Sequence, residues 1–168
     1  MEPFVNKVAE SGIITINLEQ YLPQHMVVFD LKPFLYMELL LKEKDFRAAL
    51  LQHDWSTYMN ADVVITCTSD AIIPVWAYML VAQYLQPLAA SICCDSAAKA
   101  TESLLLRNIQ DMDTAAFENQ RVVIKGCGEI PIPASAYAAI TAKLKPVVKS
   151  LMYGEPCSTV PIYKKKIT

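Results

Sequence analysis

The cysteines are the residues of this chain with the most distinctive chemistry. There are five, an odd number with no Cys-x-x-Cys pair: Cys67, Cys93, Cys94, Cys127 and Cys157. Such a set favours free thiols in a reducing compartment over a disulfide framework. A thiolate is both a nucleophile and a ligand for soft metals. The cysteines therefore favour a protein that handles a soft metal, an iron–sulfur cluster or a persulfide sulfur.

Cys127 is the strongest candidate for a functional thiolate. It lies between Gly126 and Gly128, directly follows Lys125-Gly126, and precedes a predicted helix. A nearby cation and the positive end of a helix dipole both favour the thiolate form. The glycines would let the backbone approach a ligand closely. We predict that Cys127 is the principal thiol or metal ligand and that Cys157 is its partner.

The other cysteines receive different interpretations. Cys67 and Cys94 are candidates to complete a soft ligand set, and Asp70 and Glu155 are candidates to support it from neighbouring loops. Cys93 is predicted to pack in the core, because adjacent residues of a strand point to opposite faces and free cysteine packs as a small hydrophobe.

A repeat organises the chain around these thiols. Shifting the sequence by 59 positions aligns residues 63–91 with residues 122–150 and gives ten identities over 29 pairs, where about two would arise by chance. The repeat predicts two strand, loop, helix and strand units in which Pro74 and Pro133 occupy equivalent first turns. The matched Tyr78 and Tyr137 are interpreted as shared packing residues.

Strands alternate with helices along the predicted fold. β-branched and apolar runs predict strands at residues 13–18, 26–30, 63–66, 91–94, 121–125 and 150–153. Apolar periodicity predicts helices at residues 43–52, 73–84, 97–110 and 134–144. The alternation predicts a single layered α/β domain over residues 1–168 with a mainly parallel sheet. Residues 31–42 fit either a short helix or a strand, and both remain open.

This topology places all five cysteines at one edge of the sheet. Each follows or ends a predicted strand, and the carboxyl ends of parallel strands form the edge at which ligands bind. His25 and His53 precede strands and are placed at the opposite edge. That arrangement argues against a Cys–His nucleophile pair, whose members must lie within hydrogen-bond reach.

Composition bounds the class of protein. Of 168 residues, 54% are hydrophobic and 19% charged, which indicates one globular domain that buries roughly 70% of its unfolded surface. The apolar surplus favours a homo-oligomer, with a dimer expected. A formal charge of −2 gives no basic surface for nucleic acid. Without a signal pattern or a membrane-length apolar run, the chain is predicted to be cytoplasmic and not membrane-bound.

The chain also resembles a known family. Its motifs at residues 41–47, 53–56, 70–74, 123–127 and 152–161 are similar to a bacterial family of uncharacterised proteins, domain-of-unknown-function family two-four-eight-zero. The most specific motif reads Met-Tyr-Gly-Glu-Pro-Cys-Ser-Thr-Val-Pro, and the resemblance covers nearly the whole chain. It implies no activity or catalytic residues, and it suggests a setting near iron–sulfur cluster assembly.

Two functions from different classes remain open. The first is a thiol-site accessory protein that handles a soft metal, a cluster or persulfide sulfur. The second is a non-catalytic scaffold or partner-binding subunit whose cysteines are structural, and a small thiol-dependent enzyme is a third. The positions of the sulfur atoms discriminate between the first two. Thiols that converge on one site favour the first, and thiols buried separately among apolar side chains favour the second.

Overall fold

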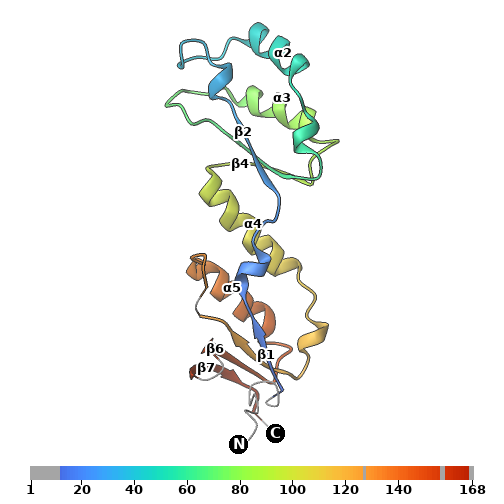
Figure 1. The fold of residues 1–168 in the computed structure, drawn as a ribbon, viewed down its shortest axis with the longest axis vertical. Helices are drawn as coiled ribbons and strands as arrows, with labels where there is room; N and C mark the ends of the chain where they lie inside the picture. The colour runs from blue at the N-terminus through green and yellow to red at the C-terminus, as the bar shows by residue number, and fades with distance from the viewer. Residues whose placement is uncertain (1–11, 127, 156–157, 167–168) are drawn as a thin grey trace, which may run out of the picture. The chain divides into compact units, whose positions relative to one another are not determined.

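The computed structural model describes residues 12–126, 128–155 and 158–166. Strands and helices alternate along the chain, as Figure 1 shows. The strands are β1 (Ile13–Ile16), β2 (Met26–Asp30), β3 (Asp62–Thr66), β4 (Ser91–Cys94), β5 (Arg121–Ile124), β6 (Ser150–Glu155) and β7 (Ser158–Lys164). The α-helices are α2 (Glu43–Gln52), α3 (Val75–Leu85), α4 (Ala97–Asp111) and α5 (Ala134–Leu144). Short 3-10 helices are η1 (Leu18–Tyr21), η2 (Lys32–Phe34), η3 (Ser56–Tyr58) and η4 (Ala115–Phe117).

The strands form two sheets. One is wholly parallel with the order β2-β3-β4, and the other has the order β1-β5-β6-β7, in which β7 pairs antiparallel with β6. The predicted α/β class with mainly parallel strands is confirmed. The strands are divided between two sheets, however, whereas the sequence was interpreted as one sheet, because a local pattern identifies a strand but does not choose its neighbour.

The contacts divide the chain into two compact units. The inserted unit is Pro23–Thr101, and the terminal unit consists of Met1–Leu22 and Glu102–Thr168. Each unit contains one sheet, and the chain leaves the terminal unit after η1 and returns to it within α4. The expectation of a single domain stays a prediction.

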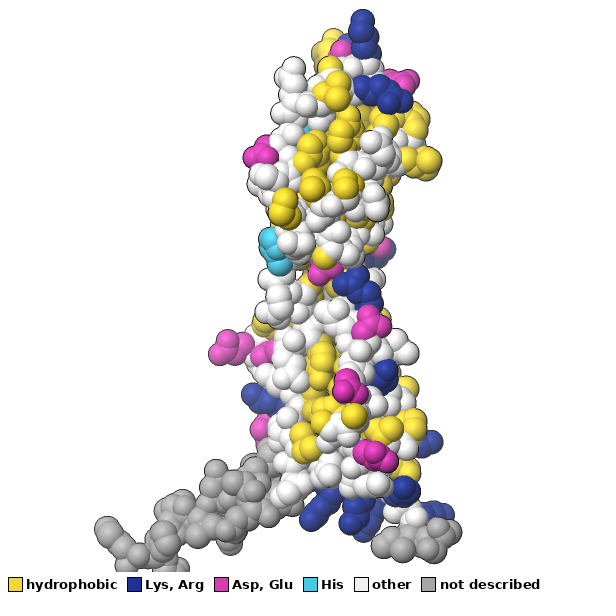
Figure 2. All heavy atoms as spheres, turned by 90° about the vertical axis from the view of Figure 1, so that its right-hand side faces the viewer, with side chains coloured by type: hydrophobic (Ala, Val, Ile, Leu, Met, Phe, Trp, Pro, Cys, Tyr) yellow, Lys and Arg dark blue, Asp and Glu magenta, His cyan; other side chains and the backbone are white. Residues whose placement is uncertain are grey.

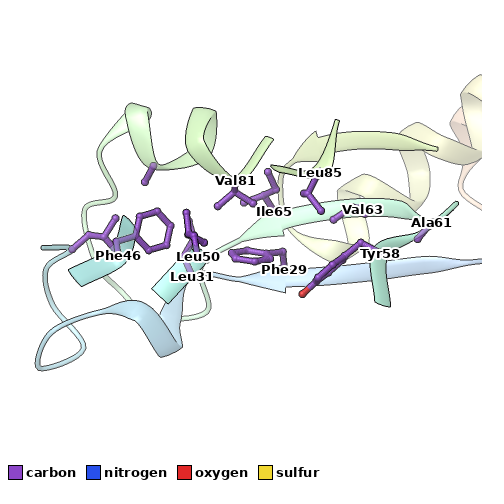
Figure 3. Close-up of a cluster of buried hydrophobic side chains, with 12 residues drawn as sticks. Phe29, Leu31, Phe46, Leu50, Tyr58, Ala61, Val63, Ile65, Val81 and Leu85 are labelled. Carbon is purple, nitrogen blue, oxygen red and sulfur yellow. The ribbon is translucent and has the colours of Figure 1, made fainter. Parts of the chain in front are cut away.

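The core of the inserted unit lies between its sheet and α3. Val63 and Ile65 of β3 are fully buried, and Val81 and Leu85 of α3 point toward them in Figure 3. Buried residues spaced four apart on α3 lie on one helix face, and burying each such side chain stabilises the fold by about 1.5 to 3 kcal/mol. This packing fixes α3 against the central strand.

A cluster of aromatic rings extends this core. Phe29 stacks on Phe34 and Trp55, with ring centroids 5.4 and 5.5 Å apart. His53 meets Trp55 edge to face, and its Nε2 lies 3.2 Å from the hydroxyl of Tyr58, a residue that precedes β3. His53 is therefore part of a packed aromatic cluster.

The terminal unit has its own core. Its buried side chains come from β1, η1, β5 and β6, from the second half of α4, from one face of α5 and from the loop before β6. They are Ile16, Leu18, Leu105, Ile109, Val122, Ile124, Ala136, Ile140, Leu144, Val148 and Leu151. The edge strand β7 contains Pro161, which has no N–H to offer to another strand and so protects the edge from further pairing.

The elements of the two units correspond at a spacing of 59 residues. The bounds of α3 and α5 differ by 59 at both ends, and Pro74 and Pro133 are the N-cap residues, one position before the predicted first turns. The paired strands follow the same rule, since β3 pairs with β4 in the register that β5 adopts with β6. The sequence repeat itself stays a prediction.

Two segments were left open or missed by the sequence patterns. Residues 31–42 form η2 and then a turn closed by one bridge between Tyr36 and Leu40, so they are neither a helix nor a strand of the sheet. Strand β7 was not predicted, because Pro161 interrupts its alternation of apolar and polar residues. Pairing with β6 overrides this weak local signal.

Two asparagines hold equivalent turns before the central strands. Asn60 and Asn119 have φ of 56° and 55°, and their N–H groups donate to Leu88 O and Val147 O. The left-handed conformation is costly for residues other than glycine, and asparagine tolerates it better than most.

We expect Asn60→Ala to lower the free energy of unfolding by about 1 kcal/mol, because alanine in the left-handed region is strained by about that amount. Asn60→Gly is the matched control and should cost less, since glycine adopts this conformation freely. Urea unfolding measures both. An alanine variant as stable as the wild type would show that the turn tolerates any residue.

Candidate functional site

Cys67 and Cys94 both lie at the carboxyl edge of the inserted sheet. Cys67 directly follows β3, and Cys94 ends the neighbouring strand β4, where it pairs with Ile65. Both line a cavity of about 490 Å³, which we call the thiol cavity. Tyr78 of α3 and Asp95 line it as well. The parallel strands therefore bring these two predicted residues to one site, as parallel topology requires.

Burial favours the neutral forms of two groups that line the thiol cavity, Cys94 and Tyr78. Partial burial raises the pKa of the Cys94 thiol, although the residue as a whole is exposed. Burial also raises the pKa of Tyr78, and negative charge on Cys67 or Cys94 raises it further. The Cys67 thiol donates to the Ser69 carbonyl oxygen at 3.5 Å. At neutral pH Cys94 is a thiol rather than an activated thiolate nucleophile.

The donor set of this cavity limits what it could hold. Two thiols suit a soft monovalent metal ion or a sulfur species, whereas iron–sulfur clusters are commonly held by four thiolates. Among the residues that the structure describes, no group of three or more His, Cys, Asp or Glu side chains is placed to hold a metal ion. The described part of the cavity thus has two thiols, fewer than the four thiolates that commonly hold a cluster.

Asp30 braces the loop that carries Cys67. It ends β2, and its carboxylate accepts hydrogen bonds from Lys32 N at 3.0 Å and from Thr68 N and Oγ1 at 3.0 and 2.5 Å. Burial raises the pKa of Asp30, but the bonds from Thr68 and Lys32 and the Lys32 charge outweigh burial, so the net pKa is lowered. A carboxylate thus fixes the residue after Cys67.

The terminal unit has a cavity at the corresponding edge of its own sheet. This cavity of about 390 Å³ is lined by Lys125, Gly126, Gly128, Tyr137 and Tyr153, among others. Its position corresponds to that of the thiol cavity at the 59-residue spacing. Among the described residues, both cavities are lined by a tyrosine of the following helix, and the cavity of the inserted unit is also lined by two cysteines.

The two glycines of this loop make room for the chain's own side chains. A Cβ at Gly126 would lie 2.9 Å from the Tyr153 hydroxyl, and a Cβ at Gly128 would overlap the Glu19 carboxylate. The sequence analysis expected these glycines to admit a ligand. The structure adds a packing reason, since at both positions a larger residue would collide with a neighbouring side chain.

Glu19 holds this loop as Asp30 holds the other. Its carboxylate accepts from Ile130 N at 2.8 Å and from Asn17 Nδ2 at 3.2 Å. These two bonds lower the pKa of Glu19 most, burial opposes them, and a further backbone bond and the Lys125 charge add to the lowering. Glu19 thus ties the segment after β1 to the loop after β5.

Of the other predicted site residues, Lys125, Gly126 and Gly128 line the cavity of the terminal unit. Cys127 and Cys157 lie outside the described residues. Asp70 is exposed in the loop between β3 and α3, and Glu155 is the last, partly buried residue of β6. Cys93 is partly buried on β4. Of the predicted set, the structure therefore places two thiols together, Cys67 and Cys94.

Tyr78 and Asp30 are the site residues whose roles sequence reasoning missed. Tyr78 was interpreted as a packing residue because it matches Tyr137 in the repeat, yet it faces both thiols in the cavity. A carboxylate at the end of a strand was the available signal for Asp30. Its link to Thr68 joins residues 38 positions apart, which no local pattern reveals.

The chain belongs to a protein family of unknown function. Residues 2–165 match the family described as "Protein of unknown function (DUF2480)", which confirms the resemblance noted in the sequence. No curated protein and no solved structure matches the chain. Among the described helices, none combines the length and the apolar character that crossing a membrane requires.

Asp30→Ala should lower the free energy of unfolding at pH 7 by about 1 to 2 kcal/mol, as expected for hydrogen bonds to a partly exposed charged group. Asp70→Ala is the control. Asp70 is exposed in the loop after β3, and its substitution should change the free energy of unfolding little. Urea unfolding at several pH values measures both.

The sign of the pH dependence follows from the lowered pKa of Asp30. The contribution of Asp30 to the free energy of unfolding is present above the ordinary aspartate pKa of 3.8. It is lost as the pH falls through the lower pKa of the folded state. The gap between wild type and Asp30→Ala should therefore close in acid. A gap that does not narrow as the pH falls below 3.8 would remove the charge-based account.

Proposed function

We propose that this protein is an accessory protein that binds a small, soft cargo through the paired thiols of Cys67 and Cys94. The observation that carries this proposal is that both thiols line one cavity of about 490 Å³ at the carboxyl edge of a parallel sheet. Ligands bind at this edge in open parallel sheets.

Comparison of the two units supports a ligand role over a packing role. At the 59-residue spacing, Cys67 corresponds to Gly126 and Cys94 to Tyr153. The terminal unit builds its edge cavity from those residues without a thiol at either position. The framework of strand, helix and strand therefore does not require cysteine there, and the thiols of the inserted unit call for another explanation.

The raised pKa of Cys94 bears on the type of chemistry that this site supports. Burial favours a neutral thiol at Cys94, which is a poor nucleophile, so binding is better supported than thiol-dependent catalysis. A soft monovalent metal ion or a sulfane sulfur species suits two thiols. The Tyr78 hydroxyl, kept protonated by its raised pKa, can donate a hydrogen bond to a thiolate formed on binding.

The proposed cellular compartment rests on the same thiols. Unpaired cysteines that line an accessible cavity stay reduced in the cytoplasm, where thiol reductants are abundant. We place the protein there, and we propose that it passes its cargo on rather than keeping it as a cofactor. An iron–sulfur cluster would need further thiolates beyond the described pair.

The alternative is a partner-binding subunit with structural cysteines. The observation that favours it is the exposed apolar surface of α3 and the segment before it, where Ile72, Val75 and Met79 face solvent. Soluble proteins seldom leave such a surface uncovered. The two functions do not exclude each other, because this surface can be covered while the thiols bind a cargo.

We expect the reduced protein to bind one monovalent copper ion, and either Cys67→Ser or Cys94→Ser to weaken this binding by about tenfold or more. Competition with a chromophoric copper chelator under anaerobic conditions measures the affinity. Cys93→Ser is the matched control, since it makes the same change on the same strand next to Cys94 and does not line the cavity.

Copper affinity should rise with pH, because the Cys94 thiol must lose its proton to become a ligand and its pKa is raised. Repeating the competition at a series of pH values on either side of neutrality tests this. Equal affinity in wild type and in both cavity variants would contradict the thiol-site function and leave the partner-binding alternative.

A further inference from the structure

The solvent face of α3 is apolar. Ile72, just before the helix, is 93% exposed, and Val75 and Met79 are 74% and 67% exposed. Val75 and Met79 are four residues apart within α3 and therefore fall on one face of the helix. Figure 2 shows hydrophobic side chains gathered on a face of the inserted unit. Burial of side chains this size is favourable, so leaving them in water calls for an explanation.

The fold does not require this apolar face. Helix α5 occupies the equivalent place in the terminal unit, and at the 59-residue spacing it has the exposed small residues Ala134 and Ala138 in place of Val75 and Met79. Both helices bury the opposite face with the same spacing. The large apolar residues of α3 are thus a property of this helix and not of the supersecondary unit.

A neighbouring loop extends the face. Met37 is exposed at the tip of this loop, and it and Glu38 adopt the left-handed conformation with φ of 50° and 57°. This conformation is strained for residues other than glycine. The Ser69 hydroxyl donates to Glu38 O at 2.9 Å, which ties the loop to the segment that leads into Ile72.

The charge pattern of α3 indicates what covers this face. Of the four described α-helices, α3 is the one without a charged residue, and its exposed positions include the neutral Gln83. In a two-fold interface each residue approaches the copy of its own surface patch, so any charge near the axis would meet a like charge. A charge-free apolar helix is compatible with itself. A membrane surface, in contrast, would select for lysine and arginine around the apolar stripe.

We propose that Met37, Ile72, Val75 and Met79 form a homodimer interface in which α3 of one copy packs against α3 of a second copy. The isologous contact removes the exposed stripe from water on both chains at once. Val75 also lines the thiol cavity, so the second copy would lie beside that cavity. This inference is independent of the cargo of the thiols.

Sedimentation analysis of the full chain over nanomolar to high micromolar concentrations tests the interface. The wild type should convert from monomer to dimer, and Met79→Lys should raise the dimer dissociation constant by about tenfold or more, because it sets two ammonium groups against each other. Ala138→Lys introduces the same charge at the equivalent, exposed position of α5, and it should leave the dissociation constant unchanged.

Ile72→Lys serves as the second variant. Ile72 precedes the helix and is almost fully exposed, so a failure of Met79→Lys to fold, detected by circular dichroism, leaves Ile72→Lys to decide. It too should weaken the dimer by about tenfold or more. The proposal is overturned by a wild type that stays monomeric throughout. A dimer that a folded Met79→Lys or Ile72→Lys variant leaves intact, or that Ala138→Lys weakens equally, overturns it as well.

Discussion

The burial of β3 is the constraint on which the inserted unit depends. Val63, Val64 and Ile65 are all fully buried, and the strand pairs with β2 on one side and β4 on the other. A central parallel strand cannot shift by one residue without turning its side chains to the wrong face. The register of β3 is therefore fixed, and it determines where Cys67 and Cys94 lie at the carboxyl edge. The site is a consequence of how the core is packed.

The two units show how one framework can carry different chemistry. In each, a carboxylate located after or at the end of the first strand braces the loop that follows the second strand, Asp30 in the inserted unit and Glu19 in the terminal unit. The helix that follows contributes a tyrosine at the same position, Tyr78 or Tyr137, to the edge cavity. What differs is the set of residues that the strands present, which is where function is placed on a fold.

Sequence patterns predicted most of the elements and little of their assembly. Apolar periodicity located the four helices. The predicted parallel strands placed Cys67 and Cys94 at the same edge. Both predictions depend only on the local spacing of residues. The division into two sheets depends on contacts between distant residues, and β7 was hidden by Pro161. Tyr78 was interpreted as packing because its position toward the thiols depends on how α3 lies over the sheet. Gly126 was interpreted as room for a ligand, since no local signal reports the approach of the Tyr153 ring.

The central claim is that the thiols of Cys67 and Cys94 share a single cavity and can bind one cargo together. A monosubstituted trivalent arsenical tests this most directly, because it bonds to two thiols only when they can reach the same arsenic atom. Peptide mass mapping of the reduced, folded protein should find one arsenical bridging Cys67 and Cys94. A bridge between Cys93 and Cys94, or no bridge involving Cys67, would contradict the account.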